Sequence, residues 1–174
     1  MPIWILLFAS LLVLFLLIFF RDPERTPDGE GMLSPADGKI RSMNGQKISI
    51  FMNLHNVHVN RAPLSGTVKS IRYEKGAFKP AFLAASGKNE KNKITLATEY
   101  GDTALTQVAG FFARRIVCYV SEGENVARGQ RLGMIRFGSR VDVTVPENFE
   151  INVTPGDKVK AGKTVIAISR RSVP

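Results

Sequence analysis

The stretch GENVARGQRLGMI at residues 123–135 recurs later in the chain as GDKVKAGKTVIAI at residues 156–168. Both copies follow the pattern G-[DE]-x-V-x-x-G-x-x-[LV]-x-x-I. The two glycines suit turns with a positive φ angle, and the acidic residue suits the first corner of such a turn. The apolar positions can bury the strands on either side. The repeat therefore predicts a β domain that contains two similar half-motifs.

Short β-strands are predicted on both sides of the repeat. Residues 47–54 alternate apolar side chains with others, as in a strand that buries one face. Further strands are expected at 94–98, 104–108, 115–120, 141–145, 151–153 and 165–168. No helical periodicity of useful length follows the first twenty residues. We therefore expect residues 39–174 to form one mostly β domain, similar to the barrel-sandwich architecture of biotinyl and lipoyl carrier domains.

A carrier function is the first alternative that this architecture raises. Carrier domains present a modifiable lysine at a tight hairpin between their two half-motifs. The corresponding segment here, residues 135–142, reads IRFGSRVD and contains no lysine. A membrane-tethered carrier or binding module remains an alternative, although the chain lacks the lysine that a carrier needs at this hairpin. Gly138 and Ser139 occupy the hairpin instead.

The first twenty residues differ sharply from the rest of the chain. Residues 3–20 read IWILLFASLLVLFLLIFF, with Ser10 as the only polar residue. As a helix rising about 1.5 Å per residue this segment is ~27 Å long, close to the thickness of a bilayer's hydrocarbon core. It lacks the basic start and the small residues before the cut that a signal peptide has. We expect residues 1–20 to be a transmembrane anchor and residues 21–38, rich in Pro and Gly, to be a linker.

The charge of the chain is confined to the part after the apolar segment. All 24 Lys and Arg residues and all 15 Asp and Glu residues lie in 21–174, so this part carries the whole net charge of +9. Such a charge suits nucleic acid or an anionic membrane surface, and the apolar segment favours the membrane. Arg21 and Arg25 follow that segment and place the domain in the cytoplasm by the positive-inside tendency. Cys118 is the only cysteine, so no internal disulfide and no multi-cysteine zinc site are expected.

Three segments carry residues suited to catalysis. Ser139 follows a glycine, and Gly-Ser is also an ordinary turn dipeptide. Asp37 lies in LSPADG, which could equally be a simple Asx-turn. His55 and His58 are the only histidines, three residues apart in LHNVHVNRAP. A lone H-x-x-H lacks the third and fourth ligands that zinc needs, so no metal site is predicted.

Six motifs together resemble one family. They are FFRDPER (19–25), SPADG (34–38), HNVHVNRAP (55–63), KNEKN (88–92), ARRIV (113–117) and RFGSRVD (136–142). In this order and spacing they resemble the short form of phosphatidylserine decarboxylase, together with its archaeal relative that acts on archaetidylserine. The resemblance covers about residues 19 to 170. Many family members carry Leu-Gly-Ser-Thr at the cleavage site, and this chain has Phe-Gly-Ser-Arg with the cleaved pair unchanged.

The resemblance implies that the chain cleaves itself between Gly138 and Ser139. The Ser139 hydroxyl attacks the Gly138 carbonyl, an N-to-O acyl shift forms an ester, and β-elimination breaks it. Hydrolysis then releases ammonia and leaves a pyruvoyl group at position 139, and the two chains stay associated. That cofactor forms a Schiff base with the substrate amine and serves as the electron sink that decarboxylation needs. The implied reaction converts the serine headgroup of a phospholipid to ethanolamine, with the diacyl or archaeal diether form of the lipid left open.

The resemblance also maps roles onto the three segments. Asp37, His58 and Ser139 correspond to an Asp-His-Ser triad in which His58 removes the hydroxyl proton and Asp37 orients the imidazole. His55 corresponds to the family's other histidine, a proton donor or a substrate-positioning group. Residues three apart on a regular strand point to opposite faces, so the chain must bend between residues 54 and 58 if both histidines serve one site.

Two further sets of residues have open alternatives. Four arginines could bind the lipid phosphate, or could be solvated or ion-paired: Arg61, Arg114, Arg115 and Arg140. Phe78, Phe82 and Leu83 could contact acyl chains or pack in the core. A related decarboxylase of a soluble amino acid is a third functional alternative, which the apolar segment and the positive charge disfavour.

Overall fold

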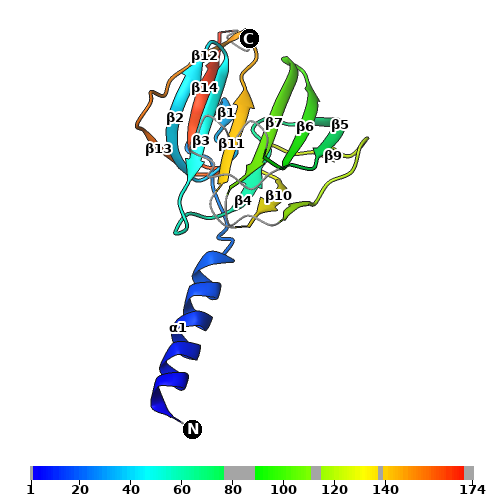
Figure 1. Ribbon diagram of the computed structural model, residues 1–174. Coiled ribbons are helices and arrows are strands. Elements are labelled where there is room, and N and C mark those ends of the chain that lie inside the picture. Colours follow the sequence, from blue (N-terminus) through cyan, green and yellow to red (C-terminus); the bar gives the residue numbers. More distant parts are fainter. Residues whose placement is uncertain (1, 77–88, 111–114, 137–138, 171–174) are drawn as a thin grey trace.

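The computed structural model describes residues 2–76, 89–110, 115–136 and 139–170, and within them one helix precedes a mostly β domain (Figure 1). The helix is α1 (Ile3–Phe19). The strands are β1 (Met32–Leu33), β2 (Gly38–Asn44), β3 (Lys47–Met52), β4 (Val59–Arg61), β5 (Gly66–Glu74), β6 (Lys91–Thr98), β7 (Gly101–Ala109), β8 (Ile116–Cys118), β9 (Asn125–Val126), β10 (Arg131–Ile135), β11 (Ser139–Thr144), β12 (Phe149–Ile151), β13 (Lys158–Val159) and β14 (Val165–Ser169). The mostly β prediction is confirmed.

The strands form one large curled sheet and two small ones. The large sheet has the order β13-β2-β3-β11-β7-β6-β5-β9, and the small sheets have the orders β1-β14-β12 and β4-β10-β8. All pairs are antiparallel. The inward side chains of the three sheets form one apolar core, which includes Ile50, Leu105, Leu132, Val141 and Phe149. Strand β11, which begins at Ser139, lies inside the large sheet between β3 and β7.

The two half-motifs adopt the turns that their sequences predict. Both glycines of each copy have positive φ, with Gly129 at 84° and Gly162 at 67°. The acidic residue of each copy accepts a backbone N–H three residues earlier: Glu124 from Ser121 at 3.1 Å, and Asp157 from Thr154 at 2.7 Å. The closer likeness to barrel-sandwich domains stays a prediction.

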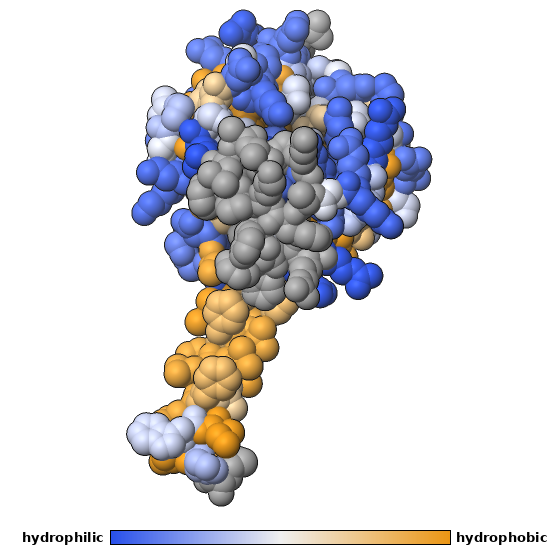
Figure 2. Space-filling view, in the orientation of Figure 1, coloured by the Kyte–Doolittle hydropathy of each residue, from blue (hydrophilic) through white to orange (hydrophobic). Residues whose placement is uncertain are grey.

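The helix α1 projects from the β domain, and most of its surface is hydrophobic (Figure 2). Within the described residues, no helix has the length and apolar character needed to cross a membrane. The expected role of residues 1–20 as an anchor stays a prediction. The helix has only 17 residues, or ~26 Å at about 1.5 Å per residue. Its last residue, Phe19, is buried by the β domain.

Candidate active site

Ser139 is the first residue of β11 and lies in the dry interior of the domain. It is fully buried and pairs with Met52 of β3 on one side and Ala109 of β7 on the other. Its hydroxyl lies 3.3 Å from the sulfur of Met52, a weak acceptor. The predicted nucleophile therefore has no strong hydrogen-bond partner among the described residues. Gly138 lies outside them.

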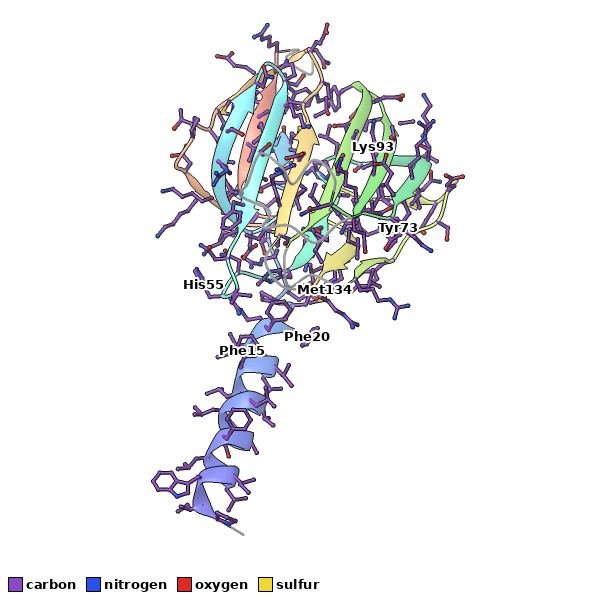
Figure 3. All side chains as sticks on the ribbon, in the orientation of Figure 1. Phe15, Phe20, His55, Tyr73, Lys93 and Met134 are labelled. Atoms are coloured by element: carbon purple, nitrogen blue, oxygen red, sulfur yellow. The ribbon has the colours of Figure 1, made fainter. Side chains whose placement is uncertain are left out.

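The two histidines lie on a bent segment between β3 and β4, as predicted. Asn53 and Asn56 close the bend with two hydrogen bonds: the Asn56 N–H donates to the Asn53 carbonyl at 3.0 Å, and the Asn53 N–H donates to the Asn56 side chain at 2.8 Å. Because of this bend His58 is fully buried, while His55 is exposed. Figure 3 shows His55 on the loop beside the junction of α1 and the domain.

The surroundings of His58 select its tautomer. Its Nδ1 lies 2.8 Å from the carbonyl oxygen of Asn56, which can only accept, so Nδ1 carries the proton. The Nε2 atom is buried and has no partner in the described part of the chain. The pKa of His58 is lowered from 6.5 to about 4, with burial as the largest cause and smaller contributions from Arg21 and His55, while the hydrogen bond to the Asn56 backbone raises it. The imidazole is therefore neutral at pH 7 with a free lone pair on Nε2, which is the form that a general base needs.

Asp37 lies close to His58 but binds other groups. Its Oδ1 accepts the Ala161 N–H at 2.7 Å, and its Oδ2 pairs with Arg25 at 3.0 Å. The carboxylate raises the pKa of His58 through its charge, against the larger effect of burial. Among the described residues, no hydrogen bond joins Asp37 to His58 or His58 to Ser139. The structure gives the orienting hydrogen bond to the carbonyl of Asn56.

A backbone hydrogen bond joins His58 to the strand that leads toward Ser139. The backbone N–H of Ile135, at the end of β10, donates to the His58 carbonyl at 3.3 Å. Ile135 precedes Ser139 by four residues in sequence. Met52, which contacts the Ser139 hydroxyl, also lies 3.9 Å from the side-chain nitrogen of Asn60 on β4. Ser139 and the strand that follows His58 therefore border the same interior region.

A chain of buried amides extends from this region, and the sequence analysis did not assign it a role. Gln107 donates to the side-chain oxygen of Asn60 at 2.9 Å and accepts from the side-chain nitrogen of Asn92 at 3.0 Å. All three side chains are almost fully buried. The signal in the sequence was Gln107, a polar residue at an inward strand position between Leu105 and Ala109.

The arginines separate into two groups. Arg61 is buried and pairs with Asp22 at 2.8 Å, and Arg140 pairs with Asp142 at 3.0 Å. These two pairings favour the ion-pair alternative over phosphate binding. Arg115 is exposed, whereas Arg114 lies outside the described residues, as do Phe78, Phe82 and Leu83.

A basic groove lies beside Asp37 and His55. Its volume is about 360 Å³, and lysines from β2, β13 and the second half-motif line it. They are Lys39, Lys158, Lys160 and Lys163. Only Lys163 has a carboxylate within ion-pair distance among the described residues, Asp28 at 3.3 Å. The groove therefore offers uncompensated positive charge next to the exposed histidine.

Comparison with known proteins identifies the family of this chain. The family model described as phosphatidylserine decarboxylase matches residues 12–167. The chain is 54% identical over 158 residues to a putative archaetidylserine decarboxylase proenzyme of Methanosarcina acetivorans, covering 90% of this chain and 76% of the relative. It is 52% identical over 152 residues to the corresponding protein of Archaeoglobus fulgidus, covering 87% and 77%. It is 49% identical over 176 residues to a phosphatidylserine decarboxylase proenzyme of Syntrophus aciditrophicus, covering 92% and 83%. The chain belongs to the phosphatidylserine decarboxylase family.

Proposed function

We propose that this chain is a proenzyme that cuts itself between Gly138 and Ser139 and then decarboxylates a phospholipid. The substrate is the serine headgroup of phosphatidylserine or archaetidylserine, and the product carries ethanolamine. Support comes from the family match over residues 12–167 and from the proenzyme relatives. The observation that carries the proposal is a buried, neutral His58 whose Nε2 is free to accept a proton.

The cleavage reaction uses groups of the chain and one water molecule. His58 Nε2 takes the hydroxyl proton of Ser139 while the carbonyl of Asn56 holds Nδ1–H. The hydroxyl oxygen attacks the Gly138 carbonyl carbon, and the C–N bond breaks to give an ester and a free amine at position 139. Loss of the Cα proton and of the ester carboxylate leaves dehydroalanine at 139. Water then replaces the nitrogen, which leaves as ammonia. The charge of Asp37 favours the imidazolium formed in the first step.

The surroundings of position 139 fit the pyruvoyl group that this sequence of steps leaves. The hydroxyl that is lost has only a thioether partner among the described residues, so its loss breaks one weak hydrogen bond. The site is fully buried, which keeps water from a reactive carbonyl. That group supplies an electron sink for the carbanion left when CO₂ departs.

The basic groove is the proposed headgroup site. An anionic phosphate can bind the three lysines that have no carboxylate within ion-pair distance among the described residues, Lys39, Lys158 and Lys160. His55 lines the same groove, where it can deliver a proton or position the headgroup. Arg61 and Arg140 are not proposed to bind the phosphate, because their guanidinium groups are paired with Asp22 and Asp142.

We further propose that α1 attaches the domain to a membrane. Every residue of α1 except Phe19 is exposed, and nearly all are apolar. An exposed apolar face of this size is typical of a surface that contacts lipid. Arg21, which follows the helix and is exposed, favours anionic headgroups.

Intact-mass measurement of the purified protein tests the processing step. We expect a chain of 138 residues ending at Gly138 and a chain of 36 residues without an α-amine, which resists Edman sequencing. Ser139→Ala should remain one chain and release no CO₂ from phosphatidylserine or archaetidylserine in vesicles. Full activity of an uncut chain would refute the proposal, and a single inactive wild-type chain would favour the binding-module alternative.

A further inference from the structure

The last turn of α1 packs directly on the proposed catalytic histidine. The ring centroids of Phe19 and His58 are 4.4 Å apart, with an angle of 31° between the planes. Phe19 is fully buried and is the only buried residue of α1. It forms a small apolar cluster with Val57, Val59 and Met134, two of which flank His58 in sequence. Figure 3 shows Phe20 and Met134 at this junction.

We propose that Phe19 is a positioning residue for self-cleavage, because its ring covers the imidazole of His58, excludes water from it and fixes its plane. The inference rests on the proposed role of His58 as the base. In this proposal α1 has a second role besides contact with lipid, because its last residue covers His58. The helix end completes the wall of the active site.

The contacts around the junction support this role. Arg21, two residues after Phe19, donates to the Ile18 carbonyl in the last turn of α1 at 2.5 Å. The same guanidinium donates to the His55 carbonyl at 2.6 Å. Arg21 therefore ties the end of the helix to the loop that carries both histidines. These two hydrogen bonds of Arg21 therefore hold the ring of Phe19 over His58.

The main consequence of covering His58 is electrostatic. Burial is the largest cause that lowers the pKa of His58 to about 4. The charged groups that act on it are Arg21 and His55, which lower the pKa, and Asp37, which raises it. Arg136, which follows β10, lies over the ring of Phe20. Removing the Phe19 ring changes none of these charges, so water that enters its place should move the pKa back toward 6.5.

Proton NMR titration of the full-length Ser139→Ala precursor in detergent micelles tests the proposal. The chain has two histidines, so both imidazoles can be followed. Phe19→Ala should raise the pKa of His58 from about 4 toward 6.5 and leave that of His55 unchanged. Phe19→Leu, which keeps an apolar cover, should retain most of the shift. Phe8→Ala is the matched control, because Phe8 lies on the same helix and is 70% exposed. Phe19→Val replaces Phe19→Ala if the latter does not fold.

The self-cleavage reaction gives the second readout, with Ser139 restored. Precursor refolded between pH 5 and pH 7.5 should cleave at a nearly constant rate in the wild type. Phe19→Ala should cleave at least about tenfold more slowly at pH 5 than at pH 7.5, because each pH unit below the pKa removes a factor of about ten of the free base. An unchanged His58 titration in Phe19→Ala overturns the proposal. A shifted titration without a shifted cleavage profile instead shows that His58 is not the base, which is a failure of the proposed function.

Discussion

The side chain of His58 is buried, whereas that of His55, three residues earlier, is exposed to solvent. The difference comes from the bend that Asn53 and Asn56 close, which turns one side chain inward and leaves the other in the basic groove. A buried imidazole with a fixed tautomer suits a base that acts once, inside the fold. An exposed imidazole beside lysines suits a group that contacts the phospholipid headgroup. The two residues should therefore separate experimentally.

Replacing each histidine by alanine tests this separation. His58→Ala should slow self-cleavage by about 10²–10⁴-fold, the usual contribution of a positioned general base. His55→Ala should form both chains at a normal rate and then show a lower kcat on lipid. Gel analysis of a refolding time course measures the first effect, and CO₂ release by the mature enzyme measures the second. Normal cleavage in His58→Ala would transfer the role of base to another residue.

For single residues, the sequence indicated which side chains to consider but not which groups they bind. Ser139, His58 and Asp37 are all buried, and the triad that the motif resemblance maps onto them stays a prediction. The hydrogen bond that orients His58 comes from the backbone of Asn56, and a carbonyl in an irregular turn leaves no trace in a motif. The partner of Asp37, Arg25, belongs to a segment predicted only as a linker.

Among the elements, the segment between α1 and β1 is held more firmly than a linker requires. Asp22 pairs with the buried Arg61 at 2.8 Å and also with Arg131 of β10. Arg61 further donates to the carbonyls of Gly129 and Pro23. These contacts fasten the segment to the first half-motif. They fix the direction in which α1 leaves the domain (Figure 1).

Removing Asp22 should therefore cost stability. Asp22→Ala leaves the guanidinium of Arg61 buried without its carboxylate, and we expect a loss of about 3 kcal/mol in the free energy of unfolding. Asp102→Ala is the control, because its pair with Lys69 is exposed and should contribute no more than about 1 kcal/mol. Urea unfolding of the Ser139→Ala precursor, followed by far-UV circular dichroism, measures both. Equal losses would show that the segment is not clamped.

The turns of the half-motifs were predictable from sequence because glycine is required there for a local reason. At Gly162 the φ angle is 67°, and an added Cβ would lie 2.6 Å from the Arg61 side chain. The order of strands in the large sheet was not predictable. Neighbours such as β11 and β3 are far apart in sequence, and their pairing depends on the packing of the whole core.

For the whole molecule, the first twenty residues do not all stand apart from the β domain. The sequence predicted them as one apolar segment. Hydropathy does not distinguish an apolar residue that faces lipid from one that packs against the β domain. In the structure Phe19 belongs to the β domain, and the remainder of α1 projects from it. We therefore expect the boundary between lipid contact and the catalytic domain to fall at the last turn of the helix. Two shortened chains can locate that boundary.

A chain shortened to begin at Phe19 should retain self-cleavage, because the Asp22–Arg61 pair still holds the aromatic cover in place. A chain that begins at Arg21 lacks the cover and should show the acid-sensitive cleavage of Phe19→Ala. Both should lose more turnover on lipid in bilayers than on detergent-dispersed lipid, because α1 supplies local concentration and no chemistry. The remaining basic surface should still prefer anionic vesicles, and that preference should fade as salt rises. Equal losses on bilayers and on dispersed lipid in the chain that begins at Phe19 would contradict this division. They would show that α1 supports the catalytic site beyond its last turn.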